Sequence, residues 1–152
     1  MINMKAERQF IGNSTYRSRL VDGHFHTELC PHGSGDRTAL MIEKAIELRI
    51  EKVCLTEHAP LPKAFEAEYG GDKIAYDTAS LKLNQVDSYL ELGRELQRAY
   101  GTHIDISLGF EVDYIPGFES DIQDFLDRYG PLTDDNILSV HFMDGVGGKY
   151  YC

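Results

Sequence analysis

Short apolar segments alternate with amphipathic helical segments along most of this chain, and this alternation limits the folds open to it. Apolar segments with strand character lie at residues 20–26, 53–55, 104–112 and 137–141. Helical spacing of apolar residues occurs over residues 37–50, 79–100 and 118–129. The order strand–helix–strand predicts βαβ units, with a parallel sheet and helices packed outside it. We therefore expect an α/β protein with four β/α units.

The number of units is small for a closed barrel. Parallel β/α barrels usually need about seven or eight strands and about 250 residues, whereas this chain has 152 residues. The alternation therefore predicts the first part of a barrel, C-terminally truncated, in one domain over residues 20–152. Residues 1–19 show no clear period and are expected to form an N-terminal extension of unassigned structure. The open strand edges of such a half-barrel predict self-association.

The acidic character of the chain argues against contact with nucleic acid. Its formal net charge is -10 and its pI is about 4.9, so it repels phosphate backbones, and its 15 Lys and Arg residues are scattered. No apolar run has the length of a signal peptide or a membrane span. Three irregularly spaced cysteines without a Cys-x-x-Cys pair predict a reducing compartment. We expect a cytoplasmic protein that binds neither nucleic acid nor membrane.

Two connections between the expected elements have distinctive compositions. Residues 62–77 form a long polar connection, for which we predict a functional lid. Asp36 is the predicted N-cap of the helix over residues 37–50. Residues 145–148 are rich in glycine, but no Lys-Ser or Lys-Thr pair follows them, so a phosphate-cradling P-loop is not expected.

His24 and His26 have the spacing of metal ligands. Residues two apart in a strand point to the same side, so both imidazoles can reach one ion while Phe25 faces the packing layer. Imidazole is a common ligand of transition metals. The alternative is that both histidines are ordinary polar residues at the end of a strand.

Each of the other expected strands also ends in a group that can bind a metal, namely His58, Glu111 or His141. In parallel β/α folds the C-terminal strand ends form one face, which carries the active site. We therefore predict that these side chains meet His24 and His26 on that face. Taken alone, His58 could instead form hydrogen bonds at its strand end, and Glu111 could be a buried, paired carboxylate.

The motifs around these residues resemble, in the same order, those of the polymerase-and-histidinol-phosphatase (PHP) family. They span residues 21–142 and are Asp22-Gly23-His24-Phe25-His26-Thr27, Cys30-Pro31-His32, Thr56-Glu57-His58-Ala59-Pro60-Leu61-Pro62, Gly109-Phe110-Glu111-Val112-Asp113-Tyr114 and Ile137-Leu138-Ser139-Val140-His141-Phe142. The His-x-His and Thr-Glu-His motifs are shared by the wider superfamily. The Cys-Pro-His, Ala-Pro-Leu-Pro and Glu-Val-Asp-Tyr segments are similar to the histidinol-phosphatase branch in particular.

The resemblance implies a distorted TIM-like (β/α)7 barrel of the PHP type, of which this chain holds about the first four β/α units, with two or three divalent metal ions at its C-terminal face. Carried over position by position, the implied metal ligands are His24, His26, His32, His58, Glu111 and His141. Glu111 would bridge the ion of the His-x-His pair to a second ion held by His141, and the other two histidines would hold a third. Zinc, iron and manganese all suit such a mixture of imidazole and carboxylate.

Neighbouring polar residues have predicted supporting roles. Glu57 is interpreted as a group that orients a ligand, or alternatively as a solvated carboxylate, and Asp113 as a similar supporting group. Without the resemblance, His32 would be an ordinary loop histidine. Cys30 and Cys54 are expected to pack rather than to act as nucleophiles.

The resemblance also implies an activity, the hydrolysis of L-histidinol phosphate to L-histidinol and phosphate in histidine biosynthesis. A metal-bridged hydroxide would be the nucleophile, so no catalytic side chain is expected. One alternative is a PHP phosphoesterase that acts on another small phosphate ester or a nucleotide. The other is a catalytically silent metal-binding half-barrel, because the Asp-x-His motif that the family has near its C-terminus has no counterpart after residue 142.

Overall fold

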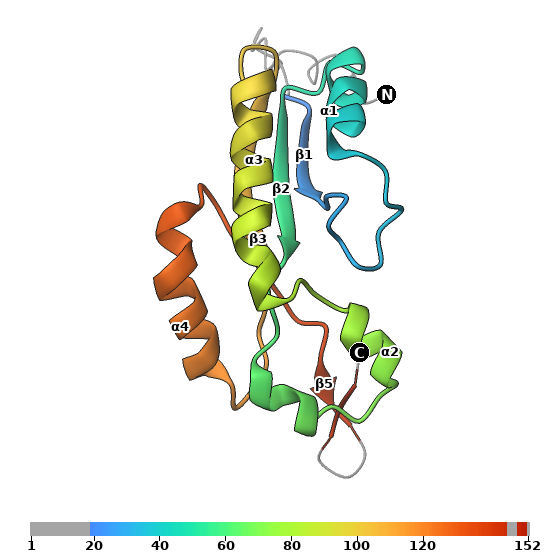
Figure 1. Cartoon of the computed structure of the whole chain (residues 1–152), viewed down its shortest axis with the longest axis vertical. Helices are drawn as coiled ribbons and strands as arrows, with labels where there is room; N and C mark the ends of the chain where they lie inside the picture. The colour runs from blue at the N-terminus through green and yellow to red at the C-terminus, as the bar shows by residue number, and fades with distance from the viewer. Residues whose placement is uncertain (1–18, 146–148, 152) are drawn as a thin grey trace, which may run out of the picture.

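The computed structural model describes residues 19–145 and 149–151 (Figure 1). Its strands are β1 Val21–Phe25, β2 Lys52–His58, β3 Asp105–Asp113, β4 Ile137–Ser139, β5 Met143–Asp144 and β6 Tyr150–Tyr151. Its α-helices are α1 Thr38–Glu47, α2 Lys73–Thr78, α3 Val86–Tyr100 and α4 Glu119–Tyr129. Its 3₁₀ turns are η1 Lys63–Ala67, η2 Leu83–Gln85 and η3 Gly130–Leu132. Nearly all of the predicted extension and most of the glycine-rich loop lie outside the described residues.

β1 to β4 form one parallel sheet in the order β1-β2-β3-β4, so strands that follow one another in the chain are also neighbours in the sheet. Parallel neighbours require a crossover connection, which here contains α1, α3 or α4. The α/β half-barrel of four β/α units that the sequence predicts is confirmed. The short antiparallel pair of β5 and β6 was not anticipated. Within the described ranges, no helix combines the length and the apolar character needed to cross a membrane.

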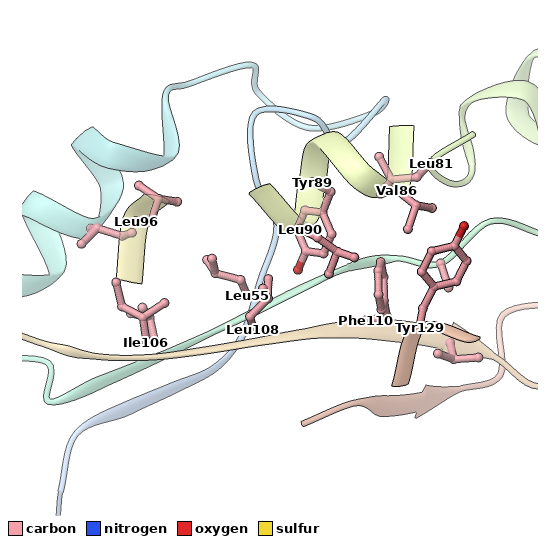
Figure 2. Close-up of a cluster of buried hydrophobic side chains, with 14 of the residues drawn as sticks. Leu55, Leu81, Val86, Tyr89, Leu90, Leu96, Ile106, Leu108, Phe110 and Tyr129 are labelled. Carbon is pink, nitrogen blue, oxygen red and sulfur yellow. The ribbon is translucent and has the colours of Figure 1, made fainter. Parts of the chain in front are cut away.

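The helix-covered face of the sheet carries the main hydrophobic core (Figure 2). Val53 and Leu55 of β2 alternate with residues that point the other way, and so do Leu108 and Phe110 of β3. The helical residues buried against them include Val86, Tyr89, Leu90, Leu96 and Tyr129. Burial of these side chains fixes the sheet, and thereby the positions of the strand ends.

The N-terminus of α1 is capped differently from the prediction. Asp36 is not the N-cap; Arg37 occupies that position and makes no capping hydrogen bond through its side chain. The Glu28 carboxylate, from the preceding loop, instead accepts the N–H of Thr38. The predicted helix is also too long, because α1 ends before Arg49, whose φ of 59° is left-handed. A cap supplied from ten residues away cannot be read from helical periodicity.

The connection over residues 62–77 is folded rather than open. It contains η1 and α2, and Phe65 of η1 is fully buried in a second apolar cluster with Ile115 and Phe142. The predicted polar loop therefore has secondary structure and is anchored through Phe65, while most of its other residues are exposed, and its function as a lid stays a prediction. The predicted helix over residues 79–100 starts later than expected, because η2 precedes α3.

The register of the sheet brings the candidate site together. β2 and β3 pair so that His58 lies directly beside Glu111. At Gly109 of β3, a Cβ atom would lie 1.5 Å from the carbonyl oxygen of Asp135, so only glycine leaves room for the segment that leads into β4. β4 ends earlier than predicted, and His141 lies just beyond it.

Candidate metal centre

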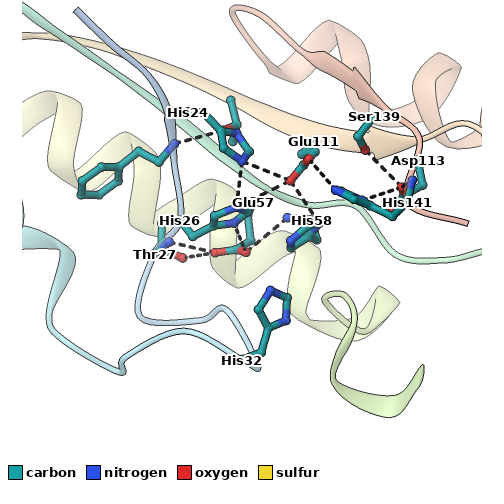
Figure 3. A network of polar contacts seen from close by, with 12 residues as sticks. His24, His26, Thr27, His32, Glu57, His58, Glu111, Asp113, Ser139 and His141 are labelled. Carbon is teal, nitrogen blue, oxygen red and sulfur yellow. Dashed lines mark hydrogen bonds and ion pairs between the residues drawn. The ribbon is translucent and has the colours of Figure 1, made fainter. Parts of the chain in front are cut away.

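Four imidazoles surround the carboxylate of Glu111 at the C-terminal ends of the strands (Figure 3). Glu111 Oε2 lies 3.5 Å from His24 Nε2, 3.5 Å from His26 Nε2 and 3.1 Å from His58 Nδ1. Glu111 Oε1 lies 3.5 Å from His141 Nε2. The structure thus brings together these five predicted site residues, which come from four separate parts of the chain.

These five residues form two compact groups that share Glu111. One group is His24, His26 and Glu111, and the other is His58, Glu111 and His141. Within each group the potential ligand atoms lie within 4.8 Å of one another. A shared carboxylate between two such groups is an arrangement that suits a pair of neighbouring cations.

Two buried atoms of the cluster make no hydrogen bond among the described residues. They are His58 Nδ1 and Glu111 Oε2, which approach to 3.1 Å without hydrogen-bond alignment. Only 7% of the Glu111 side chain is exposed, and an unpaired buried carboxylate oxygen is costly. Both atoms have a lone pair suited to a cation, so the residues present fit a divalent metal ion.

Carboxylates hold the outer nitrogens of two of these imidazoles. His26 Nδ1 lies 3.0 Å from Glu57 Oε1, and His141 Nδ1 lies 2.8 Å from Asp113 Oδ1. A carboxylate only accepts, so each Nδ1 donates its proton, and in the neutral ring the lone pair is then on Nε2, which faces Glu111. This pattern of carboxylate, histidine and metal orients imidazole ligands in many metal sites.

Glu57 is completely buried and fully engaged in hydrogen bonds. Its carboxylate accepts the N–H of Thr27 at 2.9 Å, the hydroxyl of Thr27 at 2.7 Å and the N–H of His58 at 3.2 Å, besides the His26 contact. Burial alone would raise the pKa of Glu57, but the hydrogen bonds from His26 and Thr27 outweigh it and lower the pKa. The same bond raises the pKa of His26. The alternative of a solvated carboxylate is therefore wrong, and Glu57 contacts a histidine instead.

His58 is the most deeply buried of the clustered imidazoles. Its burial, together with the neighbouring imidazoles, lowers its pKa to about 4. The side chain is therefore neutral near pH 7, which is the form that can donate a lone pair to a metal.

His32 lies beside the cluster on the loop between β1 and α1. Its ring centroid is 5.0 Å from that of His58 and 6.4 Å from that of His26. Its Nδ1 lies 2.7 Å from the carbonyl oxygen of Thr78, which therefore accepts the Nδ1 proton. His32 is exposed and belongs to neither compact group, so the structure brings it near the site without joining it to Glu111.

Sequence reasoning did not identify two threonines that contact the site, Thr27 and Thr56. Thr56 Oγ1 lies 2.9 Å from His24 Nδ1. The one available signal was position, since Thr27 directly follows His26 and Thr56 directly precedes Glu57 within the motifs. Cys30 and Cys54 are free cysteines, and burial raises the pKa of both thiols, which disfavours the nucleophilic thiolate.

A half-barrel of parallel strands with imidazole and carboxylate groups at its C-terminal face is typical of metal-dependent hydrolases built on β/α barrels. The family model described as PHP domain matches residues 22–151. The chain belongs to this family.

One relative found by sequence and one found by structure show which members of the family the chain is similar to. It is 41% identical over 131 residues to the histidinol-phosphatase of Bacillus subtilis, covering 86% of this chain and 47% of the relative. It matches the crystal structure of HisK from Listeria monocytogenes with a TM-score of 0.83 and 43% identity, over 86% of this chain and 47% of that one. The chain therefore spans about half the length of these relatives.

A more distant structure supports the fold. The histidinol phosphate phosphatase of Lactococcus lactis, solved in complex with zinc, L-histidinol and phosphate, matches with a TM-score of 0.62 and 24% identity. The match covers 86% of this chain and 42% of that protein. The half-barrel is thus common to proteins whose sequences have diverged widely.

Proposed function

We propose that the protein is a metal-dependent phosphomonoesterase that hydrolyses L-histidinol phosphate to L-histidinol and phosphate, as a step of histidine biosynthesis in the cytoplasm. The observation that carries the proposal is the buried Glu111 carboxylate, which faces four imidazoles and leaves Oε2 without a hydrogen bond among the described residues. Identity of 41% with a histidinol-phosphatase supports the substrate. The small-molecule substrate would be a phosphate monoester.

The proposed ligands are divided among two or three divalent ions. His24 and His26 would share one ion with Glu111, which would also reach the ion held by His141. His58 and His32 would hold a third ion, an assignment supported by the 5.0 Å separation of their ring centroids, although His58 also belongs to the compact group of Glu111 and His141. Zinc, iron and manganese remain the candidate metals, because each accepts imidazole and carboxylate ligands.

The residues of the chain have distinct tasks in this proposal. Glu57 and Asp113 hold the rings of His26 and His141 through Nδ1, so the Nε2 lone pairs point into the site. Burial keeps His58 neutral and available as a ligand. Divalent ions bound there would lower the pKa of water towards neutrality and neutralise the phosphate oxygens during in-line attack. None of the described nucleophilic side chains is required for this chemistry.

The chain boundaries proposed from the sequence accompany this function. Residues 20–152 would form the PHP domain, and residues 1–19 an N-terminal extension. The family match over residues 22–151 supports this division. Limited proteolysis with mass spectrometry would locate the cleavage sites, and zinc titration of the products would test the division. Cleavage before residue 20 should leave the zinc affinity unchanged, whereas removal of β1 should abolish zinc binding.

Phosphate release tests the activity, and metal titration tests the site. The chain would be incubated with zinc, iron(II) or manganese(II) and a panel containing L-histidinol phosphate, other small phosphate esters and nucleotides. Preferred release from L-histidinol phosphate is the expected result. A clear preference for nucleotides would overturn the substrate assignment.

A metal-binding function without turnover is the second candidate. It is favoured by one observation, that the clustered imidazoles and Glu111 can hold a metal ion whether or not phosphate is released. Isothermal titration with zinc, iron(II) and manganese(II), combined with the phosphate-release assay, separates the two candidates. Tight metal binding without phosphate release would support the second candidate, and absence of binding of all three metals would contradict both.

A further inference from the structure

The group that orients His24 differs in kind from those that orient His26 and His141. The latter two rings each face a carboxylate, which can only accept a proton. His24 Nδ1 instead lies 2.9 Å from the hydroxyl oxygen of Thr56. The difference matters because a hydroxyl can both accept and donate, so the identity of its other partners decides what it offers to His24.

Thr56 is buried, and its hydroxyl contacts β1. It is 2% exposed on β2, and its Oγ1 also accepts the backbone N–H of Phe25 at 3.2 Å. The hydroxyl therefore retains one lone pair and one proton for His24. Because Phe25 follows His24 directly in β1, the two contacts fix both the ring and the backbone that carries it.

The role of His24 Nε2 decides whether the Thr56 hydroxyl accepts a proton from Nδ1 or donates one to it. His24 Nε2 lies 3.2 Å from His26 Nε2 and 3.5 Å from Glu111 Oε2. If Nε2 is to donate a lone pair to a cation, the ring proton must lie on Nδ1, and Nδ1 then needs an acceptor. Thr56 Oγ1 is the acceptor within reach.

We propose that Thr56 is a positioning residue that makes His24 a metal ligand, by accepting the Nδ1 proton and directing Nε2 towards Glu111. This inference rests on the proposed metal site. A hydroxyl also suits this place electrostatically, because Glu57 and Glu111 are already buried carboxylates and a third negative charge would be costly.

Three variants test the role of Thr56. Thr56→Val keeps the β-branched shape and removes the oxygen, whereas Thr56→Ser keeps the oxygen. Thr38→Val is the matched control, since Thr38 is fully buried and its hydroxyl accepts the N–H of Glu28 outside the cluster. Zinc titration should show binding weakened about 10- to 100-fold in Thr56→Val. Thr56→Ser and Thr38→Val should retain nearly the affinity of the unchanged chain.

Nitrogen-15 NMR of the histidine rings reports which ring nitrogen carries the proton, and general destabilisation of the fold would not change this assignment. In the zinc-loaded chain, His24 should carry its proton on Nδ1, and this signal should persist in Thr56→Ser and disappear in Thr56→Val. A proton on Nε2 in the zinc-loaded, unchanged chain would overturn the inference, even if Thr56→Val did not fold. Unchanged zinc affinity in Thr56→Val would also overturn the inference, as would an equal loss of zinc affinity in Thr38→Val.

His24→Ala separates failure of this inference from failure of the proposed site. If His24→Ala weakens zinc binding and Thr56→Val does not, only the role of Thr56 is lost. If neither change weakens binding, His24 is not a ligand and the proposed metal site fails with it.

Discussion

β2 and β3 carry two regions that are buried to the same depth for opposite reasons. On the helix-covered face, Val53 and Phe110 are fully buried among apolar side chains. At the C-terminal ends, Glu57 is also fully buried, and Glu111 is 6% exposed. Burial stabilises the first region and costs free energy in the second. We therefore propose that the core sets the stability of the fold, whereas the strand ends serve metal binding.

The largest effect on folding is expected from the apolar region. Phe110→Ala removes a ring that packs 5.1 Å, centroid to centroid, from both Tyr89 and Phe125. We expect the free energy of unfolding to fall by about 3–5 kcal/mol, measured by urea denaturation. The zinc stoichiometry of the fraction that remains folded should not change. A loss below about 1 kcal/mol would contradict the role of this face as the source of stability.

The opposite result is expected at the strand ends. Glu111→Gln keeps the shape and removes the charge, so zinc affinity should fall by more than about 100-fold, beyond the usual effect of an orienting residue. The metal-free chain should be as stable as before or more stable, because a buried, unpaired carboxylate oxygen is removed. Zinc titration and urea denaturation measure the two effects. Unchanged zinc affinity would remove Glu111 from the site.

A smaller effect is expected from a group that orients a ligand without binding the ion. Asp113→Asn retains an acceptor for His141 and removes the charge, so zinc affinity should fall about 10-fold. Asp127→Asn on the exposed side of α4 is the matched control and should have no effect. Equal behaviour of the two variants in zinc titration would show that Asp113 does not support the site.

The smallest effect on stability is expected at the open edge of the sheet. Leu138 of β4 is 66% exposed, so Leu138→Lys should change the free energy of unfolding by less than about 0.5 kcal/mol. An unpaired edge strand favours association, and a lysine there disfavours it. Analytical ultracentrifugation should therefore show fewer dimers in the variant. Equal association in both chains would contradict pairing through β4.

Strong periodic signals made the fold predictable, and distant contacts made its details unpredictable. Helical spacing identified α3 and α4, and the four strands of the parallel sheet lie where apolar segments were found. The Asp36 cap was wrong because the Glu28 carboxylate accepts the Thr38 N–H instead. Similarly, Phe65 is buried by Ile115 and by Phe142, which is far along the chain.

The candidate site shows the same division. His24, His26, His58, Glu111 and His141 were predicted to share one face, because parallel strands end on the same side, and they lie together. The groups that hold their outer nitrogens are less visible in sequence. Thr56 was missed because its role depends on the pairing of β1 with β2.

The sequence by itself determined the order of the four strands of the parallel sheet and of α1, α3 and α4, together with the residue types that lie at the strand ends, since these follow from local periodicity. Only the tertiary structure decided that His58 stands beside Glu111, that two buried atoms lack a hydrogen bond among the described residues, and which groups hold each imidazole. The physical reason is that strand register and burial depend on contacts between segments far apart in the chain, which no local pattern records.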